Sequence, residues 1–238
     1  MNTFTHFCPE HIVMLAVIAV AITTGLLLIR RISEKTAAVT AVILSVITLM
    51  GEAFQDVLLI KEGGNIINFL PLHLCNLGIF VNLLAALTRG RLQSFFAEVS
   101  LVLIAPGSAA ALLFPDWTYR PFWSSVSMLC FFTHTLLVFV PLMFLIRKKT
   151  HVSFKHFWYP YAFFAFAVPP VYILNVKEGL NYMYLMHPPE NSPLEWIYNI
   201  TGSSHYIQGL FILITVILAI EYSLYTFFDV HFHRKIAG

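Results

Sequence analysis

Charged residues are scarce in this chain. Asp, Glu, Lys and Arg together make up 11% of its 238 residues, while apolar residues make up 58%. Soluble domains carry about a quarter charged residues, and the mean hydropathy here is +0.78, so the composition excludes a soluble domain. A bilayer core is spanned by about 20 mostly apolar residues, and spans of this length use up nearly the whole sequence. We therefore expect one membrane domain over residues 1–238.

Cysteine is also scarce. The chain has only Cys8, Cys75 and Cys130, an odd number with no CxxC spacing, which argues against a disulfide framework and a thiolate metal site. We expect neither a metal nor a cofactor. The region before His11 has no Lys or Arg and so lacks the basic start of a cleavable signal peptide. The first apolar run is expected to remain as a helix.

Several familiar motifs are missing. The sequence has no GxSxG, HExxH, P-loop or GxGxxG motif, which are signatures of hydrolases, zinc proteases and nucleotide-binding proteins. It has no basic and aromatic groove for nucleic acid. It shows no internal repeat of the kind found in many transporters, and no arginine-rich membrane helix typical of a voltage sensor.

What the chain has instead is a series of long apolar runs of helix-spanning length. They predict an all-α polytopic membrane helix bundle of seven transmembrane helices, at about residues 11–30, 36–60, 66–88, 94–114, 122–146, 157–176 and 204–226. The longest connection is an outer loop over residues 177–203.

The basic residues predict the orientation of these helices. Of the 14 Lys and Arg residues, only Lys61, Arg120 and Lys177 lie in the second, fourth and sixth connections. The others lie in the first, third and fifth connections and in the tail. Cytoplasmic loops carry an excess of Lys and Arg. We therefore expect a multi-pass protein of the cell membrane with its N-terminus outside and its C-terminus in the cytoplasm.

A polar stretch inside the third run is the first candidate site. His73, Cys75 and Asn76 fall within four residues of an apolar segment, and polar groups at membrane depth are costly unless they face protein or a water-filled cavity. At the helical rise, Cys75 would lie about 14 Å below an outer boundary at Ile66. The alternative is structural: Asn76 bonds a neighbouring helix, and Cys75 is a small hydrophobic residue.

Two other runs carry polar groups. Glu52 and Asp56 are four residues apart near the outer end of the second run, so they share one helix face. They suit a proton relay, a cation site or the group that orients a histidine, although Asp56 alternatively lies solvated among headgroups. His134, in the fifth run, would lie about 18 Å deep, near the depth of Cys75. Its alternative role is a neutral histidine bonded to a backbone carbonyl for helix packing.

The outer loop 177–203 contains the segment Asn181–Leu185, then His187 and further aromatic residues. It has too many aromatic residues for a disordered linker. We expect it to fold back onto the membrane surface or to cover a cavity.

Several segments resemble one known family. The chain resembles the YwaF-like bacterial integral membrane proteins in Phe7–His11, Leu70–Cys75, Leu112–Asp116, His134 and Asn181–Leu185, in this order. The LPLHLC and NYMYL pieces are the specific ones, and the resemblance covers most of the chain.

The resemblance implies an activity. That family is similar to a eukaryotic multipass group implicated in acyl transfer to glycerophospholipids, in which a membrane-embedded cysteine and histidine act together. It is distantly similar to androgen-induced membrane hydrolases of fatty-acid esters, which use threonine and histidine. Carried over, the resemblance points to Cys75 as the nucleophile and His134 as the base. Cys130 lies one helical turn from His134 and is a rival nucleophile.

The leading hypothesis is a lipid-directed acyltransferase or thioesterase-like hydrolase, whose partner is a membrane lipid such as a phospholipid or another acyl donor. His73 is an alternative base, and Glu52 or Asp56 would hold the His134 imidazole in one tautomer. An oxyanion would be bound by Asn76 or Asn181.

The competing hypothesis is a non-enzymatic seven-helix transporter or receptor, in which Glu52, Asp56, His73 and His134 line a polar path. A transport path has no use for a nucleophilic thiol, so Cys75 distinguishes the two. A structural scaffold is a third possibility, and the sequence does not indicate an oligomeric state.

Overall fold

The computed structural model describes residues 3–147 and 150–236, with side chains through residue 228 outside that gap. These residues form helices and no β-strand, apart from one isolated bridge between Thr3 and Pro121. The chain divides into two compact units, residues 1–150 and 151–238, which are described separately here. The single membrane domain expected from the sequence stays a prediction.

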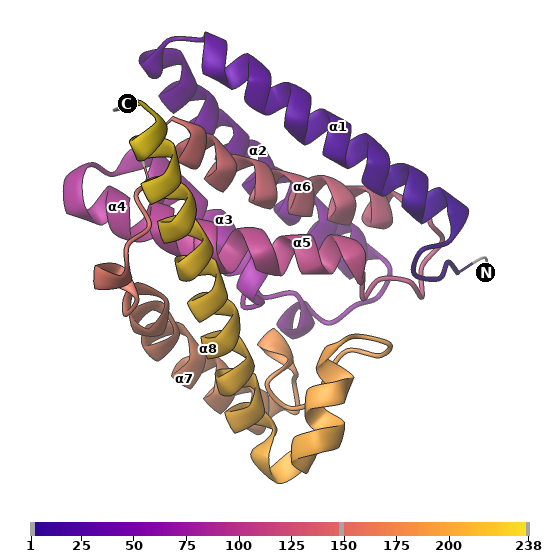
Figure 1. Ribbon diagram of the computed structural model, residues 1–238. Helices are drawn as coiled ribbons and strands as arrows, with labels where there is room; N and C mark the ends of the chain where they lie inside the picture. Colours follow the sequence, from indigo (N-terminus) through magenta and orange to yellow (C-terminus); the bar gives the residue numbers. More distant parts are fainter. Residues whose placement is uncertain (1–2, 148–149, 237–238) are drawn as a thin grey trace. The chain divides into compact units, whose positions relative to one another are not determined.

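Unit 1 contains the helices on which most of the candidate residues lie (Figure 1). Its α-helices are α1 (Pro9–Arg31), α2 (Glu34–Lys61), α3 (Leu74–Leu87), α4 (Gly90–Val99), α5 (Ala105–Leu113) and α6 (Ser125–Ile146), with a 3-10 turn at Ile66–Asn68. A π-helical segment, Ser100–Ile104, joins α4 to α5, so Gly90–Leu113 forms one span.

The described residues contain six helices that are long and apolar enough to cross a membrane. They match six of the seven predicted runs. The third run differs, because its helix begins at Leu74 rather than near Ile66 and has only 14 residues, about 21 Å of helix against a hydrocarbon core of about 30 Å. Pro71 explains the late start: it has no N–H to donate, and it disfavours helical geometry at Leu70 before it.

The π-helical segment has a similar cause. Pro106 cannot donate to the carbonyl four residues earlier, and the chain widens just before it, where the Ala105 N–H bonds the Ser100 carbonyl. π-Bulges of this kind often mark functional sites. Helix α3 approaches this segment closely, since a Cβ on Gly78 would lie 2.4 Å from a methyl of Ile104. The glycine therefore lets α3 pack against the widened turn.

Helix α6 is the centre of unit 1. It packs against α1, α2, α3 and α5, and Figure 1 shows it running between α1 and α5. One hydrophobic cluster at its N-terminal half joins α1, α5, α6 and the loop between α5 and α6. The cluster consists of Phe4, Ile18, Leu112, Trp117, Phe122, Val126, Cys130 and Phe131.

The N-terminal segment fastens the loop between α5 and α6, residues 114–124, to this cluster. The Phe4 N–H donates to the Thr118 carbonyl at 3.2 Å. His11 is fully buried, and its Nε2 donates to the Leu112 carbonyl at 2.8 Å while its Nδ1 accepts from the Phe7 N–H at 2.9 Å. The loop is thus held in place by backbone and imidazole hydrogen bonds.

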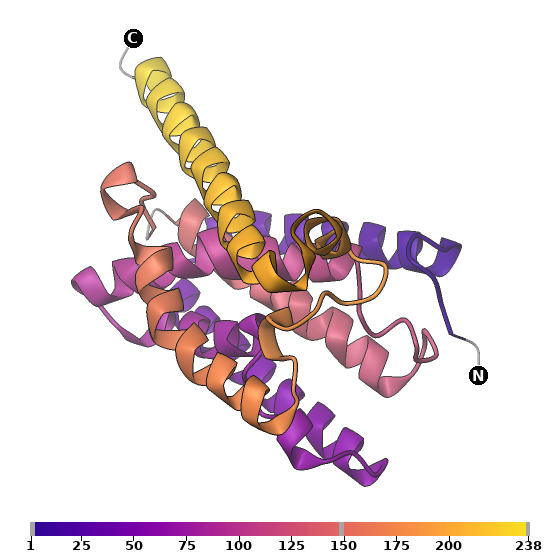
Figure 2. The same cartoon turned by 90° about the horizontal axis from the view of Figure 1, so that it is seen from below.

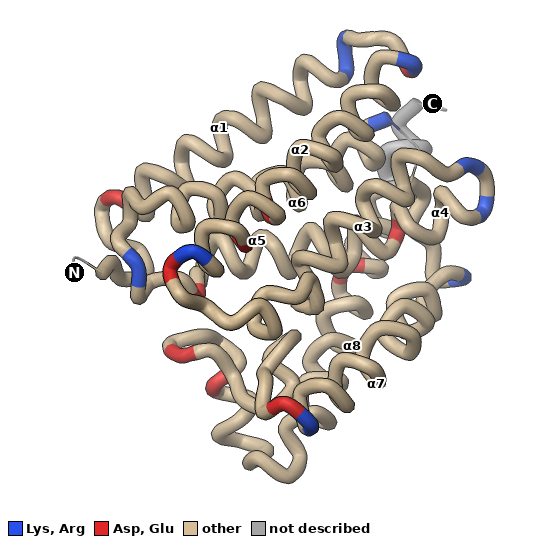
Figure 3. Tube along the Cα trace, turned by 180° about the vertical axis from the view of Figure 1, so that it is seen from behind, with Lys and Arg blue, Asp and Glu red and all other residues tan. Residues whose placement is uncertain are grey.

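Charge is concentrated at the helix ends of unit 1. Figure 3 shows the Lys and Arg residues of the α1–α2 and α3–α4 connections at the same end of the unit. Near this end Arg147 forms an ion pair with Glu34 at 2.5 Å. Arg120, in the loop between α5 and α6, pairs with Glu62 at 2.9 Å.

Unit 2 contains α7 (Tyr159–Glu178), two 3-10 turns (Phe154–His156 and Tyr182–Tyr184) and α8 (Leu194–Ile236). The predicted loop 177–203 is partly helical, because α8 begins at Leu194 and bends at Gly202, where φ is +68°. Figure 2 shows the short helix before this bend at a steep angle to the long remainder of α8. Glycine adopts this positive φ without the strain that a side chain would add.

Candidate functional site

Cys75 lies at the start of a helix, not within one. It is the second residue of α3, two positions after the N-cap residue His73. The first hydrogen bond of the helix runs from the Leu77 N–H to the His73 carbonyl at 3.0 Å. The N–H groups of Leu74, Cys75 and Asn76 precede it, and N–H groups in this position have no carbonyl partner within their own helix.

The Cys75 thiol contacts groups from two other helices. The His134 ring on α6 lies near enough to interact electrostatically with the Cys75 thiol. The Ser108 hydroxyl on α5, which is fully buried, donates to the Cys75 sulfur at 3.8 Å. The structure therefore brings the sequence's two leading candidates together, while their chemical roles remain predictions. Ser108 was not singled out as a site residue from the sequence.

A backbone carbonyl orients the His134 ring. Its Nδ1 lies 2.8 Å from the Cys130 carbonyl oxygen. A carbonyl only accepts, so Nδ1 carries the proton, and Nε2 of the neutral ring has a free lone pair. The role of Glu52 or Asp56 in holding this tautomer stays a prediction, since the contact observed at Nδ1 is the Cys130 carbonyl. The carbonyl of Cys130, four residues earlier on the same helix, orients the ring.

Glu52 supports Asn76 instead. Its carboxylate, 9% exposed on α2, accepts a hydrogen bond of 2.5 Å from the Asn76 side-chain amide. Asp56, half-buried on the same face of α2, interacts electrostatically with Glu52. Because its Nδ2 is bound to Glu52, Asn76 holds the first turn of α3 against α2.

Cys130 has a partner of its own. Its buried thiol donates to the Gln55 side-chain oxygen at 3.3 Å. Its carbonyl contacts His134, but its sulfur is directed to α2. The thiol that interacts with the His134 ring is therefore that of Cys75, while the Cys130 thiol bonds Gln55.

His73 lies just outside the α3 helix, as its N-cap residue. His73 and His134 both interact electrostatically with Asp116 and with each other. Asp116 belongs to the loop between α5 and α6. Trp117, the next residue, lies over His134 with ring centroids 5.2 Å apart and planes inclined by 32°. Neither loop residue was singled out as a site residue from the sequence, because only its membrane-interface composition was visible there.

In the loop of unit 2, the candidates Asn181 and His187 are hydrogen-bonded to each other. The Asn181 side-chain oxygen accepts from the N–H groups of Met186 and His187 at 2.9 and 3.2 Å, and its Nδ2 donates to the His187 carbonyl at 2.9 Å. Asn175 binds both backbone groups of Tyr182 at 2.9 Å. The Asn181 amide closes a turn with the exposed His187, and its role as an oxyanion donor stays a prediction.

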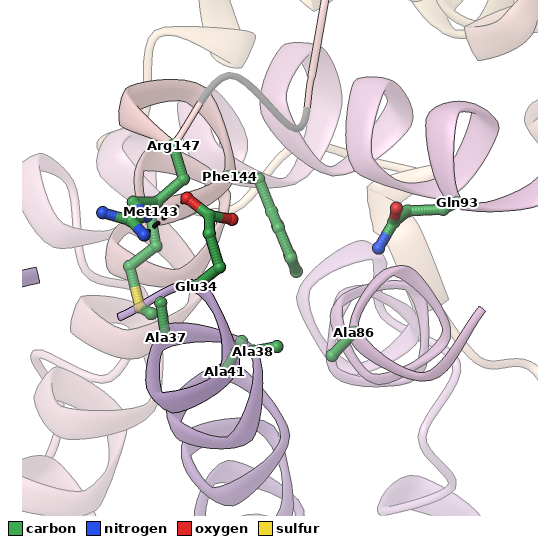
Figure 4. A pocket seen from close by; sticks show the side chains of 9 residues that line it. All are labelled: Glu34, Ala37, Ala38, Ala41, Ala86, Gln93, Met143, Phe144 and Arg147. Atoms are coloured by element: carbon green, nitrogen blue, oxygen red, sulfur yellow. Dashed lines mark ion pairs between the residues drawn. The ribbon is translucent and has the colours of Figure 1, made fainter. Parts of the chain in front are cut away.

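A cavity elsewhere in unit 1 contains none of the candidates. It has a volume of about 40 Å³, room for a few water molecules, and Figure 4 shows the Glu34–Arg147 ion pair at its wall. It is too small for an acyl chain. Within residues 3–147 and 150–228, no three His, Cys, Asp or Glu side chains are grouped as metal ligands would be.

Comparison with known proteins adds one finding. The model of the TMEM164 family matches residues 6–222. The chain belongs to the TMEM164 family. Together with the six spanning helices, membership of the TMEM164 family makes it a multipass membrane protein. No curated protein and no solved structure matches it. The resemblance to YwaF-like bacterial proteins stays a prediction.

Proposed function

We propose that this member of the TMEM164 family is a lipid-directed acyltransferase, or a hydrolase when water is the acceptor, with Cys75 as nucleophile and His134 as general base. One observation supports this most: the His134 ring interacts electrostatically with the Cys75 thiol, and its Nδ1 is oriented by the Cys130 carbonyl. A nucleophile, a base and a group that orients the base form the usual arrangement for covalent catalysis.

In the first half-reaction, the Nε2 atom of His134 takes the proton of the Cys75 thiol. The thiolate attacks the carbonyl carbon of a lipid ester and forms a C–S bond. The tetrahedral intermediate then breaks its C–O bond, and His134 returns the proton to the leaving alcohol oxygen. The products are a lysolipid and a Cys75 thioester.

The start of α3 supplies stabilisation for the charges that form. Negative charge at a helix N-terminus is favoured by the helix dipole and by N–H groups without intrahelical partners. The N–H groups of Cys75 and Asn76 precede the first hydrogen bond of α3, so they are suited to bind the oxyanion. The Asn76 side chain, bound to Glu52, holds this turn in place.

In the second half-reaction an alcohol attacks the thioester. His134 takes the proton of the attacking hydroxyl, the C–S bond breaks, and Cys75 is regenerated as a thiol with its proton from His134. A glycerolipid alcohol as acceptor gives acyl transfer, and water gives hydrolysis. The apolar spans around the site suit a lipid partner, because an acyl chain needs no soluble domain to hold it.

The experiment that tests this function uses the purified protein in detergent with a short-chain phosphatidylcholine. Intact-mass spectrometry should show a protein adduct of one acyl mass that hydroxylamine removes, as expected for a thioester. Lysophosphatidylcholine should appear in the same amount as the adduct in the first turnover. Absence of both adduct and lysolipid would contradict the proposal.

We also propose seven membrane-embedded helices, with α3 as a partial span, the N-terminus outside and the C-terminus in the cytoplasm. Irregular backbone at membrane depth is tolerated where protein buries it, and the basic connections at one end of unit 1 follow the positive-inside rule (Figure 3). Epitope tags at the two ends test the orientation. In intact cells an impermeant antibody should bind only the N-terminal tag, and binding of the C-terminal tag alone would reverse the orientation.

A further inference from the structure

Trp117 is a fixed part of the site, although it lies in a connecting loop. Its side chain is 4% exposed. One ring neighbour is Phe131, at 5.3 Å and edge to face, and the other is His134, at 5.2 Å. The N-terminal segment secures the loop around it through the Phe4 bond to Thr118. The indole thus keeps one position beside the proposed base.

The indole N–H is unused within the described part of the chain. Trp117 Nε1 is buried and makes no hydrogen bond to any described residue. Buried donors are almost always paired, and the indole nitrogen is a donor only. A phenylalanine would fill the same apolar cluster without leaving a donor unpaired. The nitrogen therefore calls for an acceptor that the described residues do not supply.

We propose that the Trp117 indole N–H donates to the carbonyl oxygen of the lipid ester that Cys75 attacks, making Trp117 a catalytic residue for oxyanion stabilisation. This inference rests on the proposed function. It assigns a second donor for the oxyanion, in addition to the N–H groups at the start of α3. The donor is preset by stacking, so it need not reorganise when charge develops.

The local charges favour an ester carbonyl over a phosphate as the acceptor. Asp116 precedes Trp117, and Glu52 lies within electrostatic range of His134. Acidic groups on both sides repel a phosphate, whereas a neutral carbonyl pairs with a single neutral donor. Arg120, the cation in this loop nearest in sequence, is paired with Glu62.

The test compares two reactions of one thiol. The full-length protein carries Cys8→Ala and Cys130→Ala, so Cys75 is its only thiol, and it reacts with either p-nitrophenyl decanoate or methyl methanethiosulfonate. Ester attack passes through an oxyanion, while methanethiosulfonate transfers CH₃S to the thiolate and releases sulfinate without one. Adding Trp117→Phe should lower the acylation rate about 10²-fold and leave the thiolation rate within about twofold.

A matched control is available in the same loop. Trp123 is 70% exposed, and Trp123→Phe should change neither rate. Equal acylation in the Trp117→Phe and parent proteins would overturn the role of Trp117 alone. A parallel fall in both reactions would also overturn it, because that pattern marks a structural defect. A parent protein that is thiolated but never acylated would overturn the proposed function and this inference with it.

Discussion

Replacing Cys75 with Ala should abolish the acyl adduct and reduce lysolipid release by at least about 10³-fold, because no other group in the arrangement carries the acyl chain. Folding should be preserved. Cys75 is half-buried, and its thiol contacts only the side chains of Ser108 and His134 among the contacts described. Lysolipid release measured by mass spectrometry, with thermal unfolding in the same detergent, checks both parts of this prediction.

Cys130→Ala is the matched control. Its thiol bonds Gln55 rather than His134, and the group that orients His134 is the Cys130 carbonyl, which alanine retains. We expect the adduct and the activity of this variant to stay within a few-fold of the parent. Normal activity in Cys75→Ala, or loss confined to Cys130→Ala, would exchange the roles of the two cysteines.

His134→Ala should lower the rate of acylation by about 10²- to 10⁴-fold, the usual contribution of general acid–base catalysis. The variant removes both the acceptor for the thiol proton and the proton donor to the leaving alcohol. Added imidazole should restore part of the rate, because it supplies the missing base. Burst kinetics with p-nitrophenyl decanoate measure the effect.

His73→Gln tells the two histidines apart. His73 lies outside α3 and interacts electrostatically with Asp116 and His134, whereas the Cys75 thiol is among the groups that act on His134. We expect a change of less than about tenfold, an effect through the local charges. A loss in His73→Gln that matches His134→Ala, rescued by imidazole in the same way, would make His73 the base.

The helical architecture was predictable from composition. Apolar runs, the length of a span and the scarcity of charge predicted six of the spanning helices in order. The third run, 66–88, was predicted as a full helix. The backbone instead stays non-helical until Leu74, since a proline affects the residue before it as well as its own hydrogen bond.

The site was predictable only in part. Cys75 and His134 were each indicated by polar groups in an apolar run and by their similar depth, but depth does not determine how a helix is rotated about its axis. Their contact depends on the late start of α3 and on its packing against α6. A backbone carbonyl partner for His134 was anticipated as the structural alternative, but not that it would be the carbonyl of Cys130. The ring of Trp117 had no sequence signal, because aromatic loops are common at membrane interfaces.

The most direct test of this account is to locate the acyl group itself. The protein is incubated with short-chain phosphatidylcholine, quenched in acid, digested and analysed by tandem mass spectrometry. The account predicts a hydroxylamine-sensitive acyl group on the peptide containing Cys75, and none on those containing Cys8 or Cys130. An acyl group on another residue would contradict the central claim. Without an added acceptor alcohol, deacylation is slow and an adduct should accumulate. Lysolipid release with no covalent adduct under this condition would contradict the central claim as well.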